Sequence, residues 1–146
     1  MRASAHASRH LTIGKLAQLA EVSANAVRFY EREGLMQVPP KTDSGYRVYG
    51  DEAVARLRFI KQAQHCGFTL SETQALLQLR DEASSCCNDV RTRVIEKKLE
   101  LEARIKAMKA MSKALDQLIA DCSNDTRPAD DCSILAALSG TKEPHR

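Results

Sequence analysis

Residues 87–122 read CNDVRTRVIEKKLELEARIKAMKAMSKALDQLIADC, a stretch without Gly or Pro that begins and ends with a cysteine. Apolar residues recur every seven positions in phase with the two thiols: Val94, Leu101, Met108 and Leu115. This spacing predicts one long helix, from about residue 88 to residue 120, with an apolar stripe that needs a partner, most simply a second copy of the chain. The other position of this seam carries Val90, Met111 and Leu118 and is interrupted by Lys97 and Arg104.

The two cysteines are too far apart to share an ion within one chain. They are 35 positions apart (122 − 87), or roughly 50 Å at about 1.5 Å of rise per residue. If two such helices pair antiparallel, Cys87 of one chain lies beside Cys122 of the other. Cys132, just downstream, can then complete a three-thiol cluster, and symmetry gives two such clusters per homodimer.

Three thiolates form a soft, anionic site. Such a site suits zinc, cadmium, lead or mercury rather than magnesium or calcium, and its affinity should fall at low pH because the ligands bind as thiolates. The nine residues between Cys122 and Cys132 (123–131) exceed the CxxC spacing of zinc ribbons, so these cysteines can also be read as small buried apolar residues. Candidate additional ligands are Cys86, Asp125, Asp130 and Asp131.

The composition favours a mainly helical chain. It has 146 residues with 43% hydrophobic side chains, few aromatic residues (Tyr 3, Phe 3, Trp 0) and a net charge of +3. No apolar run approaches the ~20 residues needed to span a bilayer, and MRASAHASRH at the start lacks an apolar signal core. We therefore expect a cytoplasmic protein with no membrane partner, whose five cysteines are core residues, metal ligands or redox groups rather than disulfides.

The first half of the sequence predicts two short helices with a tight connection. Thr12 can cap a helix over residues 13–20, and Ser23 can cap a second one that Gly34 ends. Such a pair is typical of a helix-turn-helix unit, whose second helix can enter the major groove of DNA. Polar residues able to reach outward from that helix are Ser23, Asn25, Arg28 and Arg32. Phe29 is expected in the core.

Turns and caps predict the remaining elements. Pro39-Pro40 and Asp43-Ser44-Gly45 lie among strand-forming residues, which indicates a small β-hairpin, or wing, within residues 35–50. Further helices are expected over residues 51–65, from the capping box of Thr69 and Glu72 to about residue 80, and over residues 132–138. Arg58 and Lys61 could contact phosphates, whereas Cys66, at an apolar helix end, is expected in the core.

The segments TIGKLAQLAEVSANAVRFYEREGL (residues 12–35) and SGYRVYGDEAVARLRFIKQAQHCGF (residues 44–68) resemble the MerR family of bacterial transcription regulators. The resemblance covers most of residues 12–138. It implies a mainly α fold with a winged helix-turn-helix N-terminal domain, a long antiparallel dimerisation helix and a C-terminal metal-binding loop with a short helix. The implied organisation is a disordered leader (1–10), helix-turn-helix and wing (11–50), a second helix pair and second wing (51–84), the dimerisation helix (86–120), the metal-binding loop and short helix (121–140) and a tail (141–146).

The resemblance also implies site residues. Cys87, from the partner chain, Cys122 and Cys132 fall where the metal-sensing branch carries its thiolates, and the ending CSILAAL is similar to regulators that answer zinc, cadmium, lead or mercury. Zinc-responsive relatives often carry a Cys and a His where this chain has Ser123 and Arg127, which argues against a two-zinc arrangement. Copper-responsive relatives lack a cysteine at the position of Cys87. The presence of Cys87 thus argues against a monovalent copper site, and the alternative that we keep is a monovalent copper or gold sensor that uses only Cys122 and Cys132.

For DNA binding, the resemblance points to Arg28 and Tyr30 of VRFYE and to Tyr46 and Arg47 of GYRVYG, the wing residues that hold phosphates. The implied function is a homodimer that binds double-stranded promoter DNA at a palindromic operator. Metal binding would distort the DNA until RNA polymerase engages the promoter and transcription is activated. The competing classes are a redox enzyme and a structural coiled coil. We expect no enzyme, because no histidine lies near the cysteine loop to act as a base.

Overall fold

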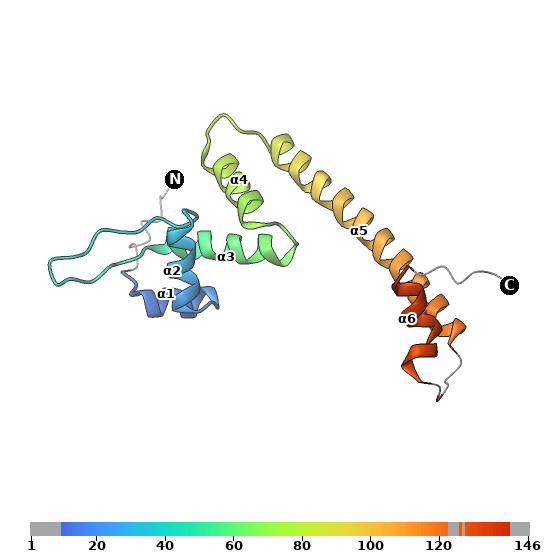
Figure 1. Ribbon diagram of the computed structural model, residues 1–146. Helices are drawn as coiled ribbons and strands as arrows, with labels where there is room; N and C mark the ends of the chain where they lie inside the picture. The colour runs from blue at the N-terminus through green and yellow to red at the C-terminus, as the bar shows by residue number, and fades with distance from the viewer. Residues whose placement is uncertain (1–9, 123–125, 127, 141–146) are drawn as a thin grey trace. The chain divides into compact units, whose positions relative to one another are not determined.

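Helices make up most of the regular structure. The computed structural model describes residues 10–122, 126 and 128–140, so most of the predicted leader, the tail and the loop residues Ser123, Asp125 and Arg127 lie outside it. The helices are α1 (Ile13–Ala20), α2 (Ala24–Arg32), α3 (Asp51–His65), α4 (Leu70–Asp81), α5 (Cys87–Asp121), the 3₁₀ turn η1 (Ala129–Asp131) and α6 (Ser133–Leu138) (Figure 1). The mainly α fold is therefore confirmed. The chain divides into two compact units, Met1–Arg93 and Val94–Arg146, which we describe one at a time.

Side-chain caps begin the two helices of the helix-turn-helix unit. The Thr12 hydroxyl accepts a hydrogen bond from the Lys15 amide (3.3 Å), and the Ser23 hydroxyl accepts one from the Ala26 amide (3.0 Å). Between the helices, Glu21 adopts a left-handed conformation with φ 57°, which ends α1 abruptly. The tight connection predicted from the sequence is confirmed.

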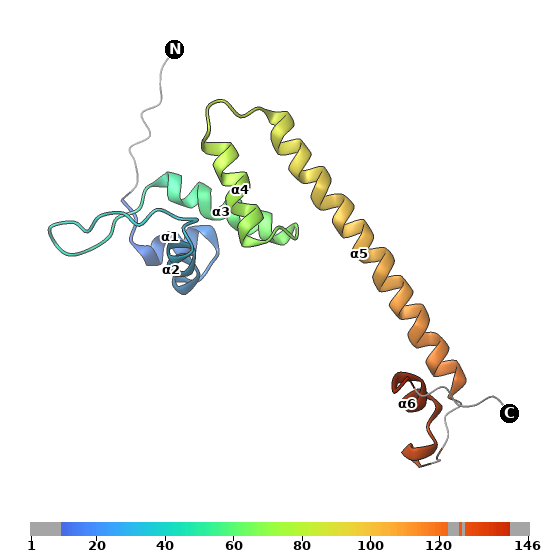
Figure 2. The same cartoon turned by 45° about the horizontal axis from the view of Figure 1, so that its top comes forward.

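The core of the first unit lies where its four helices meet. In both views α1 and α2 lie together beside α3 (Figures 1 and 2), and α1 packs against both of them while α4 packs on α3. The fully buried side chains are Leu16, Val27, Leu35, Leu57, Ile60, Leu77 and Thr73. Each buried Leu, Ile or Val contributes about 1.5–3 kcal/mol to folding. This core holds helix α2 in place.

The wing is a long loop whose described residues form single antiparallel backbone bridges and no regular strand. Its backbone pairs at Lys41 with Arg47, and its end pairs with the segment before α1 through Leu11 and Tyr49. The strands expected within residues 35–50 are therefore reduced to single bridge pairs among the described residues. Pro39-Pro40 removes two N–H donors from this segment, which prevents a longer ladder.

Two residues expected in the core lie at the surface, and both predictions were wrong. Phe29 is 37% exposed, because Val27 and Tyr30 face the core and Phe29 lies about 200° round the helix from Val27. Cys66 is exposed because α3 ends at His65 and the chain turns away through Gly67 (φ 91°). Helical periodicity no longer determines the orientation of a side chain beyond the last turn.

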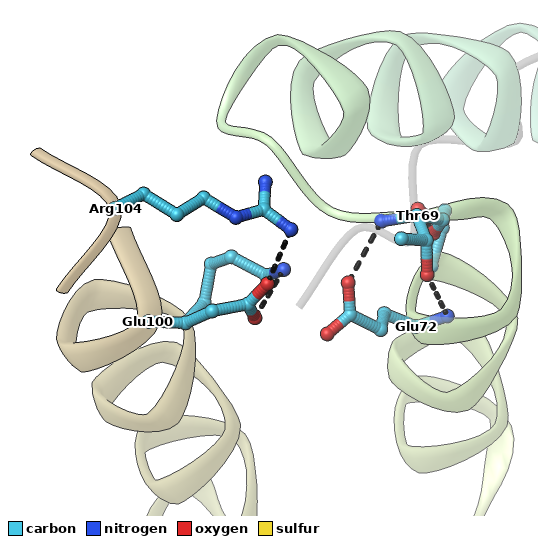
Figure 3. A network of polar contacts seen from close by, with 6 residues as sticks. Thr69, Glu72, Glu100 and Arg104 are labelled. Atoms are coloured by element: carbon cyan, nitrogen blue, oxygen red, sulfur yellow. Dashed lines mark hydrogen bonds and ion pairs between the residues drawn. The ribbon is translucent and has the colours of Figure 1, made fainter. Parts of the chain in front are cut away.

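A complete capping box begins α4. The Thr69 hydroxyl accepts from the Glu72 amide (3.2 Å), and the Glu72 carboxylate accepts from the Thr69 amide (2.9 Å) (Figure 3). Two N–H groups that a helix start would leave without partners are thereby satisfied. The prediction made from the sequence is confirmed.

Replacing Thr69 with alanine should lower the free energy of unfolding by about 1 kcal/mol, since the Glu72 amide loses its acceptor. Thermal and urea denaturation measure the change. Ser71→Ala, at an exposed position of the same helical turn, is the control and should leave the midpoint unchanged. Equal midpoints for the two variants would contradict a stabilising role for the box.

In the second unit, the apolar stripe of α5 is exposed. Val94 is 48% exposed, Met108 64% and Leu115 57%. Two of its interrupting charges share one acceptor, because Glu100 receives both Lys97 and Arg104 at 2.8 Å (the Glu100–Arg104 pair is in Figure 3). The ion pairs offset the charge that these residues bring to the seam. No helix among the described residues is long and apolar enough to cross a membrane.

Candidate metal site and DNA-binding surface

Two of the three predicted thiol ligands lie at the C-terminal end of α5. Cys122 directly follows α5 and Cys132 directly precedes α6, and both are half-buried. The Ser133 hydroxyl donates to the Asp121 carbonyl at 3.2 Å, and α6 lies beside the end of α5 in both views (Figures 1 and 2). Because Asp121 and Ser133 are the neighbours of the two cysteines, this bond closes the loop between them. Cys122 and Cys132 are therefore held at one end of the helix.

The third predicted ligand, Cys87, is the first residue of α5 and is exposed. Its neighbour Cys86, also exposed, donates its amide to the Asp89 carboxylate at 2.9 Å. This hydrogen bond from the Cys86 backbone lowers the pKa of Asp89 and caps the start of the helix. The negative Asp89 side chain lies in the first turn, where the helix dipole favours it.

A complete metal site is not formed within one chain by the described residues. No group of three or more His, Cys, Asp or Glu side chains among them could hold an ion. The single helix α5, 35 residues long, separates Cys87 from Cys122. All five cysteines are thiols rather than disulfides. The chain thus presents two thiols at one end of α5 and one predicted ligand at the other.

The outer face of α2 carries the predicted DNA contacts. Ser23, Asn25 and Arg28 are exposed, and the Arg28 guanidinium donates to the Asn25 side-chain oxygen at 3.3 Å. The Ser23 hydroxyl is engaged as the cap of α2. On the wing, Tyr46 is 69% exposed, and Arg47 is exposed beside it. Positive and hydrogen-bonding groups are thus available from both elements.

The other three predicted DNA residues have contacts within the protein. Arg58 donates to the Leu19 carbonyl at 3.2 Å. Lys61 donates to the Glu21 carbonyl at 3.0 Å and lies 3.7 Å from the Glu21 carboxylate. Arg58 and Lys61 of α3 therefore hold the end of α1 and the turn that follows it. Tyr30 is buried, at 8% exposure, and its hydroxyl donates to Gln64 at 2.8 Å, so its ring belongs to the core.

Sequence reasoning missed a polar contact that joins the recognition helix to the wing. The Tyr49 hydroxyl donates to the Glu31 carboxylate, at 3.2 and 3.1 Å from its two oxygens. Burial and the Glu31 charge raise the pKa of Tyr49, whereas the nearby guanidinium groups of Arg47 and Arg28 lower it. The contact thus lies among the predicted phosphate-binding residues. The sequence signal was the second tyrosine of GYRVYG, without any indication of its partner.

A cleft of about 730 Å³ lies between the base of the wing and α3. Met36, Val38 and Pro39 form part of one side, and Arg56 of α3 forms part of the other. Arg56 is held by the Leu35 carbonyl (2.6 Å) and by the Asp81 carboxylate (3.0 Å). None of the cysteines and none of the predicted DNA contacts line the cleft, although Tyr49 does.

Comparison with known proteins identifies the family. The family model described as MerR HTH family regulatory protein matches residues 11–79, and the model described as MerR, DNA binding matches residues 54–118. Heavy metal-dependent transcription regulator 2 of Rhizobium meliloti is 35% identical over 129 residues, which cover 88% of this chain and 86% of the relative. The mercuric resistance operon regulatory protein of Serratia marcescens is 34% identical over 135 residues, covering 92% of each chain.

A solved structure agrees with these sequence matches. The transcription regulator PbrR691 from Ralstonia metallidurans, in complex with lead(II), superposes with a TM-score of 0.79 at 32% identity, covering 88% of this chain and 98% of that one. The two family models together extend from the helix-turn-helix through most of α5. The chain therefore belongs to the MerR family of helix-turn-helix regulatory proteins, and it is a DNA-binding transcription regulator rather than an enzyme.

Proposed function

We propose that this regulator is a homodimer that responds to a thiophilic divalent metal ion, with each ion held by Cys122 and Cys132 of one chain and Cys87 of the partner subunit. The observation that carries the proposal is the bond from Ser133 to the Asp121 carbonyl, which closes the loop between two thiols. Two thiolates leave a divalent ion such as zinc short of ligands, and a third thiol lies at the far end of α5. Support comes from the relatives named as a heavy metal-dependent regulator and a mercuric resistance operon regulator, and from the solved regulator in complex with lead(II).

The exposed stripe of α5 supports the dimer. Met108 and Leu115 are more than half exposed, and apolar side chains in such a row on a long helix need a facing surface. An antiparallel second copy supplies that surface. The same pairing places Cys87 of the partner subunit beside Cys122, so one geometry accounts for both the stripe and the divided ligand set. It gives two ions per dimer.

The metal would act by shifting a conformational equilibrium. Coordination draws the loop of one chain onto the start of α5 in its partner, and the two DNA-binding units then change their relative position. Every tenfold shift towards the activating form requires about 1.4 kcal/mol of differential metal affinity. Bending and untwisting an operator costs a few kcal/mol, which thiolate coordination can supply. The distorted promoter is then engaged by RNA polymerase, and transcription is activated.

Operator contacts are assigned to the exposed residues of two elements. Arg28, with Asn25 and Ser23, contacts DNA from α2, and Tyr46 and Arg47 contact phosphates from the wing of each chain. Two such surfaces related by a twofold axis fit a palindromic operator. Arg58 and Lys61 act indirectly, by holding the end of α1 and the turn that follows it. Tyr30 supports α2 from the core.

The ligand set distinguishes two kinds of inducer. Three thiolates suit zinc, cadmium, lead or mercury, whereas monovalent copper or gold would need only Cys122 and Cys132. Cys86 directly precedes α5, and its amide donates to the Asp89 carboxylate at the start of that helix. Its thiol is exposed, so Cys86 stays a candidate additional ligand. We propose the divalent class.

A promoter-fused reporter tests this proposal when it is titrated with zinc, cadmium, lead, mercury and monovalent copper. We expect induction by one or more of the divalent ions and its loss on addition of a chelator. Induction by monovalent copper alone would favour the two-cysteine sensor. A parallel titration of the purified protein with cadmium should show thiolate charge-transfer absorption that saturates at two ions per dimer.

A further inference from the structure

A partly buried side-chain hydrogen bond joins the wing to α2. Tyr49 is only 3% exposed, and its hydroxyl faces the carboxylate of Glu31 on α2 at 3.1–3.2 Å. The backbone of Tyr49 is fixed as well, through two 2.8 Å hydrogen bonds with Leu11. The end of the wing is therefore attached to the segment before α1 by its backbone and to α2 by its side chain.

The residues flanking this contact are the proposed DNA contacts. Arg28 lies three positions before Glu31, on the same side of α2. Arg47 lies two positions before Tyr49, and each of the two residues forms a backbone bridge, Arg47 with Lys41 and Tyr49 with Leu11. The Arg28 and Arg47 guanidinium groups both act electrostatically on the Tyr49 hydroxyl. Arg28 of α2 therefore lies near Glu31, and Arg47 of the wing lies near Tyr49.

We propose that the Tyr49–Glu31 hydrogen bond sets the position of the wing relative to α2, so that Arg28 and Arg47 reach DNA phosphates together. Tyr49 and Glu31 are then positioning residues for operator binding. The wing has few other restraints, because it is built from isolated bridges. Without this bond the wing samples more positions, also on DNA, so Arg47 no longer reaches its phosphate in every complex, and ordering the wing costs entropy that the native contact has already removed. The inference rests on the proposed phosphate contacts of Arg28 and Arg47.

A pair of uncharged substitutions at position 31 separates the hydrogen bond from the charge. Glu31→Gln keeps an acceptor for Tyr49, whereas Glu31→Leu removes it, and both remove the same negative charge near DNA. We expect Glu31→Leu to bind the operator about tenfold more weakly than Glu31→Gln, the scale of a partly buried hydrogen bond. If Glu31→Leu fails to fold, Tyr49→Phe is tested in its place, because it removes the hydroxyl and keeps the buried ring. Tyr49→Phe should weaken operator binding to a similar extent.

Salt dependence distinguishes positioning from a general loss of stability. The logarithm of the operator-binding constant decreases linearly with the logarithm of the salt concentration, and the steepness of this line (its slope) reports the number of phosphate contacts. In Glu31→Leu the line should become less steep by the equivalent of about one phosphate contact per chain, and in Glu31→Gln its steepness should be unchanged. Thr69→Ala is the control for stability alone, since it removes the cap of α4, which plays no part in the proposal. It should lower the unfolding midpoint while leaving the slope and the operator affinity unchanged.

The proposal is overturned if Glu31→Leu and Glu31→Gln bind the operator equally well with the same salt slope. Arg47→Ala tests the underlying contact separately, because it should lower the slope in the otherwise native protein. An unchanged slope in Arg47→Ala would reject the phosphate contact of the wing. The affinity ratio of the two Glu31 variants would still decide whether the bond positions the wing.

Discussion

Serine in place of Cys87, Cys122 or Cys132 should abolish metal-induced transcription while operator binding stays intact. A hydroxyl is a poor ligand for a soft ion, and two thiolates leave a divalent ion such as zinc short of ligands. Substitutions of residues that merely support a ligand already weaken metal binding by about 10–100-fold, so losing a ligand should cost more than about 100-fold. The DNA-binding unit is untouched, because all three cysteines lie outside α1 to α4.

Reporter induction and gel-shift affinity measure the two effects in parallel. Cys66→Ser is the control, since this exposed thiol at the end of α3 has no proposed role in metal binding. It should retain full induction. Full induction in any one of the three ligand variants would remove that cysteine from the site.

A mixture of two inactive variants tests whether the ligands come from different chains. In a heterodimer of Cys87→Ser with Cys122→Ser, one site has all three native thiols if the set is divided between chains. Purified heterodimers should therefore bind one cadmium ion with near-native affinity, whereas each parent homodimer binds none tightly. A site contained within one chain would leave the heterodimer without any tight binding.

The second large effect is expected in the stripe of α5. Met108→Glu or Leu115→Glu should dissociate the dimer, because each dimer then buries two carboxylates where two apolar side chains packed. A loss of about 2 kcal/mol per copy gives about 4 kcal/mol per dimer, or about a 1,000-fold rise in the dimer dissociation constant. Operator binding should fall with it, since two half-sites are no longer bound together.

Analytical ultracentrifugation measures the dissociation directly. Ala103→Glu, an exposed position of the same helix outside the seam, introduces the same charge and should leave the dimer intact. If both Met108→Glu and Ala103→Glu remained dimeric, the stripe would not be the dimer interface.

Local capping signals made most helix boundaries predictable. Thr12, Ser23 and Thr69 each accept the backbone hydrogen bond expected of a cap, and the helices begin at the following residue. The long helix extends one residue beyond the expected range at each end, over Cys87–Asp121. These features depend on a few neighbouring residues, so a single sequence contains the information needed.

Contacts between distant residues were not predictable in the same way. Tyr49 and Glu31 are separated by 18 positions, and no periodicity or spacing links them. Arg58 and Lys61 were predicted to contact DNA phosphates, but the structure shows that backbone carbonyls of α1 and its turn are near enough to bind them. A surface cation has the same sequence signature whether it binds DNA or a helix end.

The three metal ligands proposed from the sequence stay a prediction, because a complete site would need a second chain. Heptad spacing placed Cys87 and Cys122 on one stripe, and the helical structure between them agrees with it. The bond between Ser133 and the Asp121 carbonyl had no sequence signal, because it depends on how the loop folds back. The pairing of chains stays a prediction, as do the assignments of residues 86–120 to dimerisation and 121–140 to metal binding.

In the proposed dimeric site, the uninterrupted length of α5 makes the metal response depend on the concentration of the protein. Since one molecule carries its thiols at opposite ends of a 35-residue rod, a solitary copy offers the ion only a partial set of ligands. When the protein concentration is below the dimer dissociation constant, transcription should not respond to ordinary concentrations of the metal. The expression level of the protein would then determine the metal concentration at which transcription is induced, together with the affinity of the thiolates for the ion.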